Sequence, residues 1–271
     1  MKEDIAVKIS IRRLAKWGFF GLAAVAVLCG LYLSVFFLPY PAFPHHGEYS
    51  GFSIYSDGEL PQDIGLVLAD ARCRVEAMPL YRGGEPPRVF LCRSRRLFAL
   101  IVKFAGKRHV GQGLLISVAG NAFFSESIIE TVGRRCGGRP VHSRLQGSLS
   151  AAIAHEVAHD LVFSEVGFRP ALRIPVWKSE GYADYSAHLA AAAMDRDYDF
   201  GNRVGVLLDD DFWQGSATAS IDRRHFRWHL LVEYLCGVRG FHFADLLDEG
   251  VTEDSAWAEM MAWYSSDRDH R

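Results

Sequence analysis

The sequence predicts an α+β protein in which one N-terminal transmembrane helix precedes a single domain with a small mixed-sheet lobe and a helical lobe. Three observations support this prediction: an uncharged apolar run near the N-terminus, short segments rich in β-branched and aromatic residues before residue 125, and long helical patterns after it. The expected boundaries are a cytoplasmic N-terminus over 1–16, a membrane helix over 17–38, a linker over 39–61 and the folded domain over 62–271. The last range is long enough for one sizeable core.

The apolar run over residues 17–38 contains no charged side chain, and as a helix rising about 1.5 Å per residue it would span a hydrocarbon core. Basic residues dominate the segment before it, whereas acidic residues come first after Pro39. Positive flanks stay in the cytoplasm, so we expect a single-pass protein whose domain is extracytoplasmic, and periplasmic in a bacterium. A cleavable signal peptide is the alternative, but the run is long and ends in Pro39 and Pro41 without a small-x-small site.

Within the domain, an irregular lead over residues 45–61 is rich in Gly, Pro, Ser and Tyr. Strands are expected over 88–92 and over 113–124, the latter as one bent strand or as two strands around Gly120. Apolar spacing predicts helices over 63–76, 95–104, 146–163, 176–194, 222–236 and 257–264. The helix over 146–163 is apolar on nearly all sides, which predicts that it is buried between the two lobes.

The strongest chemical signal is His-Glu-x-x-His at residues 155–159, inside that apolar helix. Two histidines four residues apart project from one helical face, so both imidazoles can bind one metal ion. Glu156, which follows the first histidine, can hold the attacking water and remove its proton. Chance produces such a motif at about the per-cent level in a chain with eleven histidines, so the prediction needs a third ligand.

Glu180 supplies that ligand from the start of the next expected helix. Catalytic zinc prefers three protein ligands and one open position, and His155, His159 and Glu180 meet that count. Asp184 lies one turn further along the same helical face, where it can accept a hydrogen bond from the outer nitrogen of a ligating histidine. The alternative is that Glu180 is only a favourable charge in the first turn of a helix.

This arrangement, His155-Glu156-x-x-His159 followed by Glu180-x-x-x-Asp184, resembles the gluzincin metallopeptidases, the family of thermolysin and the zinc aminopeptidases. Residues 177–185 are similar to the Trp-x-x-Glu-Gly-x-Ala-x-Tyr signature of small membrane-associated or secreted members. The specific match covers about thirty residues. The resemblance implies a zincin-like fold, one Zn²⁺ ion bound by His155, His159 and Glu180, Glu156 as general base, and a peptide or protein substrate.

The resemblance also implies a segment that binds substrate. Asn121 and Ala122, in the sequence Asn-Ala-Phe-Phe, look like the edge segment of thermolysin-like enzymes, which hold a peptide as an added strand. An ordinary core strand is the alternative reading of these residues.

Gluzincins usually bring a downstream tyrosine or histidine into the cleft to stabilise the oxyanion of the tetrahedral intermediate. The candidates by position are His229, His225 and Tyr234, with Tyr182 and Tyr185 as nearer alternatives. A second metal site on His225 and His229 is not expected, because ligands along one straight helix cannot close around an ion.

Cysteine usage fits an oxidising compartment. Cys29 lies in the apolar run, which leaves Cys73, Cys92, Cys136 and Cys236 in the domain. An even number there predicts disulfides with three possible pairings, of which Cys73 with Cys92 closes the shortest loop. Buried free thiols are the alternative.

The charge balance excludes one class of partner. A formal net charge of −2 with mixed basic and acidic residues argues against nucleic acid. The expected partners are therefore a peptide or protein substrate and a membrane contacted through residues 17–38. The sequence predicts a membrane-anchored zinc peptidase, and the alternative is a tethered binding or regulatory protein that keeps the zinc fold but is catalytically silent.

Overall fold

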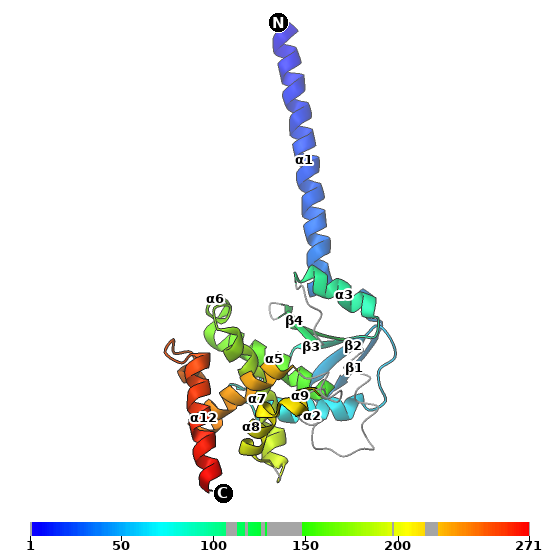
Figure 1. The fold of residues 1–271 in the computed structure, drawn as a ribbon. Helices are drawn as coiled ribbons and strands as arrows, with labels where there is room; N and C mark the ends of the chain where they lie inside the picture. Colours follow the sequence, from blue (N-terminus) through cyan, green and yellow to red (C-terminus); the bar gives the residue numbers. More distant parts are fainter. Residues whose placement is uncertain are drawn as a thin grey trace.

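The protein is described by a computed structural model that covers residues 2–106, 113–116, 119–125, 128, 148–196, 198–214 and 222–270. A long N-terminal helix, α1 (Lys2–Phe37), projects away from the rest of the molecule (Figure 1). A five-stranded sheet follows in the chain, and a group of helices makes up most of the second half (Figure 1). The architecture is thus α+β.

The sheet has the strand order β1-β2-β3-β5-β4. β1 pairs antiparallel with β2, β2 and β3 pair parallel, β3 and β5 pair parallel, and β4 pairs antiparallel with β5, so the sheet is mixed. Among the strands that the structure describes, β1 and β4 lie at the edges of the sheet. The strands are β1 (His45–Tyr49), β2 (Phe52–Ser56), β3 (Arg88–Cys92), β4 (Gly113–Ile116) and β5 (Asn121–Ser125).

Helices cover both faces of the sheet. Aromatic residues of β3 and β5 pack with α3 (Arg95–Phe104) and the end of α1 on one face. On the other face, α2 (Ile64–Glu76) and α5 (Leu149–Val166) bury apolar side chains against β2, β3 and β5. The central helix α5 also contacts the helical lobe, which confirms the expectation that this apolar helix is buried.

The helical lobe is built around the contact of α7 (Val176–Met194) with α10 (Arg223–Glu233). α8 (Phe200–Leu208) and α12 (Glu253–His270) complete its core. The remaining short elements are η1 (Tyr40–Ala42), α6 (Phe168–Ala171), α9 (Asp210–Gln214), the π-helical turn η4 (Tyr234–Val238) and α11 (Phe243–Leu246).

Local sequence sets the limits of α5. Ser148 caps its N-terminus by accepting a hydrogen bond from the Ala151 N–H. The helix ends at Gly167, whose φ of 82° lies in the region that favours glycine. These signals fix the span of the helix that carries His155 and His159.

Arg74 connects α2 to the two helices of the predicted metal site. Its guanidinium donates to the Ala187 carbonyl of α7 at 2.8 Å and to Asp70 at 2.9 Å, and Asp70 accepts from Ser150 at the start of α5 at 2.5 Å. Arg74 is only 8% exposed, so this contact forms inside the core. It helps to hold α5 and α7 in one relative position.

The predicted transmembrane helix over residues 17–38 was wrong. Among the residues that the structure describes, no helix combines the length and the apolar character needed to cross a membrane. The prediction treated the apolar run as a separate segment, but α1 begins at Lys2 and its last turns pack on the sheet lobe. The Phe36 carbonyl accepts a hydrogen bond from Asn121 Nδ2 at 2.5 Å, and Tyr32 donates to the Phe104 carbonyl. The predicted single-pass topology and extracytoplasmic domain rested on that helix and are not supported.

The expected linker over residues 39–61 also differs from the structure, because it contains the hairpin β1–β2. Phe52, Ile54 and Ser56 alternate as fully buried positions along β2, which is the period of a strand with one covered face. The many Gly, Ser and Tyr residues concealed this pattern. Ser50 and Gly51 have positive φ and close the hairpin.

The described cysteines form no disulfide. Cys29, Cys73, Cys92 and Cys236 are free, so the suggested Cys73–Cys92 bridge is not present. Cys136 lies outside the described residues. The alternative of buried free thiols fits Cys92, whereas Cys73 is exposed and Cys236 is half-buried.

The close approach of α7 to α10 requires a glycine at position 181. A Cβ atom there would lie 2.5 Å from the Trp228 carbonyl oxygen and 2.8 Å from Val232 Cγ2. We expect Gly181→Ala to lower the free energy of unfolding by about 1–3 kcal/mol, because backbone cannot move aside as a flexible side chain can. Urea unfolding of the full chain measures this change.

Gly237→Ala is the matched control, since no atom lies within 4 Å of a Cβ at that position. We expect it to stay within about 1 kcal/mol of the wild type. Equal effects of the two substitutions would show that the α7–α10 contact is less tight than described.

Candidate metal centre

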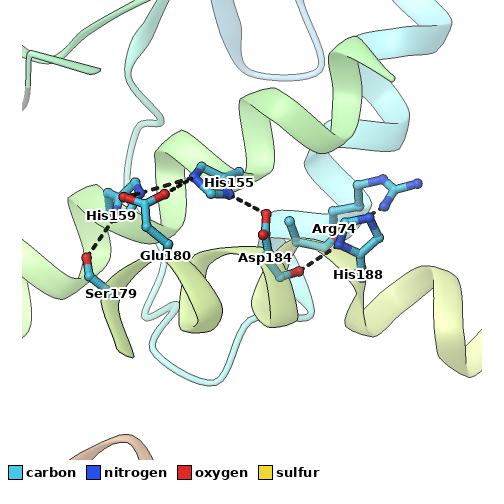
Figure 2. Close-up of polar contacts among 8 residues, drawn as sticks. Arg74, His155, His159, Ser179, Glu180, Asp184 and His188 are labelled. Carbon is cyan, nitrogen blue, oxygen red and sulfur yellow. Dashed lines mark hydrogen bonds and ion pairs between the residues drawn. The ribbon is translucent and has the colours of Figure 1, made fainter. Parts of the chain in front are cut away.

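Two helices supply the predicted metal ligands (Figure 2). His155 and His159 project from one face of α5, and Glu180 faces them from α7. Their candidate ligand atoms all lie within 4.8 Å of one another. Glu180 follows both histidines by more than twenty positions in the sequence, and the packing of α5 on α7 brings it next to them.

The distances between these atoms fit a four-coordinate ion. His155 Nε2 lies 3.1 Å from His159 Nε2 and 3.4 Å from Glu180 Oε2, and His159 Nε2 lies 3.7 Å from Glu180 Oε1. Zinc bonds of about 2.1 Å at tetrahedral angles would place neighbouring ligand atoms about 3.4 Å apart. Two imidazole nitrogens and one carboxylate oxygen are also donor types that zinc accepts. The residues present therefore fit a zinc ion.

The outer nitrogen of each histidine has its own partner. His155 Nδ1 lies 2.8 Å from Asp184 Oδ1, and His159 Nδ1 lies 3.4 Å from Ser179 Oγ (Figure 2). Both contacts place Nδ1–H toward an oxygen and leave Nε2 for a metal. The structure thus places Asp184 where the sequence predicted it. The role of Ser179 was not predicted, although its position one residue before Glu180 could have suggested it.

The centre strongly favours a positive charge. Burial raises the pKa of the Glu180 carboxyl, but contacts with His155 and His159 outweigh this effect and hold the pKa well below its usual range. Burial lowers the pKa of His155, yet the carboxylates of Asp184, Glu180 and Glu156 hold it well above its usual value. A cation bound between these groups would take the place of the proton that they otherwise attract.

Glu156 lies on the side of the centre that faces the sheet. A Cβ atom built on Gly113 of β4 would be 2.7 Å from Glu156 Oε1 and 3.1 Å from the Phe124 ring. The general base predicted from the sequence is therefore next to an edge strand. The lack of a side chain at Gly113 leaves room for the carboxylate, a role that the sequence gave no signal for.

Asn121 and Ala122 do not form the edge strand that the sequence predicted. They lie in β5, which is paired with β3 on one side and β4 on the other, so its backbone has no free edge there. Both residues are fully buried, and Asn121 contacts the end of α1. The edge strand near Glu156 is β4, and the four-residue resemblance carried no information on strand order.

The structure does not bring the three oxyanion candidates to the ligands. His229 is buried, and its ring lies 5.1 Å from that of His188. His225 packs on Trp228, and Tyr234 packs on Trp263. In the described part of the chain, no hydrogen bond, ion pair or ring contact links any of the three to the ligand residues.

Ser179→Ala tests the contact with the second histidine. We expect the dissociation constant for zinc to rise by up to about tenfold, because His159 loses the partner that fixes its ring and tautomer. Competition with a chromophoric chelator measures this constant. Ser164→Ala, at an exposed position of α5, is the control and should bind zinc like the wild type. Equal affinity in all three proteins would show that the 3.4 Å contact does not orient His159.

No protein-family model matches the chain, and none of the curated proteins is significantly similar to it.

Proposed function

We propose that the chain is a zinc-dependent peptidase of the gluzincin type, with His155, His159 and Glu180 as ligands and Glu156 as general base. The observation that carries the proposal is the convergence of the two histidine Nε2 atoms and the Glu180 carboxylate, at distances of 3.1–3.7 Å, with Asp184 in contact with His155. A structural zinc site would need a fourth protein ligand. The three grouped among the described residues match a catalytic site, which has three protein ligands and one open position.

Zinc bound at such a site acts as a Lewis acid, which makes a coordinated water more acidic and polarises the carbonyl of the scissile bond. The protein supplies the proton transfers. The Glu156 carboxylate accepts the proton of the attacking water and delivers it to the leaving nitrogen, so that the amine departs in neutral form. Asp184 keeps His155 oriented and increases the basicity of its ring.

The place of β4 at the edge of the sheet formed by the described strands supports a peptide as the substrate. An extended peptide can pair with an exposed strand through backbone hydrogen bonds, largely independently of its sequence. β4 offers such an edge beside Glu156. A peptide paired with β4 would run past the general base, where a backbone carbonyl is the group to be attacked.

Replacing the general base separates catalysis from metal binding. We expect Glu156→Gln to reduce peptide hydrolysis by about 10²- to 10⁴-fold, because the amide cannot accept the proton. Its zinc content should equal that of the wild type, since Glu156 is not a ligand. Cleavage of a peptide library with metal analysis of the same samples measures both.

Glu165→Gln, at an exposed position later in α5, is the matched control and should retain full activity. An active Glu156→Gln protein would rule out the proposed role of Glu156. A wild-type protein that holds zinc but cleaves no peptide would instead be a binding or regulatory protein.

A further inference from the structure

A buried polar cluster lies between α7, α8 and α10, next to Asp184. It contains His188, Arg203, His229 and Glu233, whose exposed fractions are 5%, 7%, 1% and 9%. None of the four was expected to act at the metal from its position in the sequence, apart from His229 as an oxyanion candidate. Together they form a continuous series of contacts that ends at Asp184.

The series starts at Arg203. Its Nη1 donates to Glu233 Oε2 at 2.5 Å, and Tyr198 bridges the two residues by donating to Glu233 and accepting from Arg203. The same Oε2 atom lies 3.4 Å from His229 Nε2. Glu233 therefore contacts both the Arg203 guanidinium and the His229 ring.

The series then passes from α10 to α7. The His229 ring lies 5.1 Å from the His188 ring at an angle of 37°. His188 Nδ1 donates to the Asp184 carbonyl at 2.7 Å (Figure 2), and the Asp184 carboxylate contacts His155 Nδ1 at 2.8 Å. Each step is a direct contact, so the series runs without a break from Arg203 to His155.

These contacts also assign the protons in the cluster. Burial lowers the pKa of His188 to about 4 despite the nearby charge of Asp184, and burial with the charge of Arg203 lowers that of His229 well below its usual value. Both rings are therefore neutral. His188 carries its proton on Nδ1, toward the Asp184 carbonyl, and His229 Nε2 faces Glu233 Oε2 at 3.4 Å.

Stability alone does not explain the cluster. Burying a guanidinium and a carboxylate is costly, and well-packed apolar residues in their place are often as stable. Burial raises the pKa of the Glu233 carboxyl, and the Arg203 charge is the counterion in contact with it. Without Arg203, the buried Glu233 carboxyl would lose its counterion, and Glu233 is the side chain that His229 Nε2 faces.

We propose that Arg203 is a positioning residue of the metal centre, which acts through Glu233, His229 and His188 to hold Asp184 and thereby His155. The inference rests on the proposed zinc site but not on peptidase activity. In this proposal Arg203, which lies on α8 and does not contact the ligands, affects their affinity for zinc.

Arg203→Met in the full chain tests the proposal. We expect its dissociation constant for zinc to rise about tenfold, as for other residues that orient metal ligands indirectly. The visible absorption bands of the cobalt-substituted protein should shift, because they report on the geometry of the ligands. Arg203→Met/Glu233→Gln, which removes both buried charges, should recover part of the affinity and the wild-type bands.

Arg239→Met is the matched control, since Arg239 makes an exposed ion pair with Glu259 at 2.7 Å. It should leave zinc affinity and the cobalt spectrum unchanged. A lower unfolding temperature for Arg203→Met with wild-type affinity and spectrum would overturn the proposal and leave Arg203 a purely structural residue.

If Arg203→Met does not fold, Arg203→Lys supplies the same test. Lysine keeps the charge but not the planar guanidinium, whose Nη1 donates to both Glu233 and Tyr198. A smaller loss of zinc affinity with a shifted spectrum supports the proposal, and wild-type values for both contradict it. A wild-type protein that binds neither zinc nor cobalt would refute the proposed zinc site itself, which is a different result from an unresponsive Arg203.

Discussion

The packing of α5 on α7 is the interaction on which the rest of the molecule depends. It places His155 Nε2 3.4 Å from Glu180 Oε2, although the two residues come from different helices. The pair is held from both sides: Arg74 of α2 binds the Ala187 carbonyl, and α10 approaches α7 closely at Gly181. Without the packing of α5 on α7, His155 and His159 would still share one helical face, but Glu180 and Asp184 would not reach them.

Local periodicity explains why most of the centre could be predicted. Spacings of four residues put His155 with His159, and Glu180 with Asp184, on single helical faces wherever the helices lie. Ser179 was missed although its position beside Glu180 could have suggested its role, whereas Gly113 and Arg203 could not be predicted in this way. Gly113 and Arg203 take their roles from strand order and from the contact of α8 with α10, which depend on tertiary packing.

The same distinction applies to the fold. Composition and spacing predicted an α+β domain and its central buried helix, because these follow from local patterns. The hairpin β1–β2 was missed because its turn-forming residues outnumber its buried ones, and Asn121 was placed on an edge because a short likeness says nothing of pairing partners. The membrane helix was inferred from apolar character alone, without the contacts that join Tyr32 and Phe36 to the sheet lobe.

α5 belongs to two hydrophobic cores at once. Its first turns complete the core beneath the sheet, while Val162 near its end belongs to the core of the helical lobe. A ligand that binds only the native state stabilises whatever must be ordered for it to bind. An ion held by α5 and α7 would therefore make the two lobes melt as one cooperative unit.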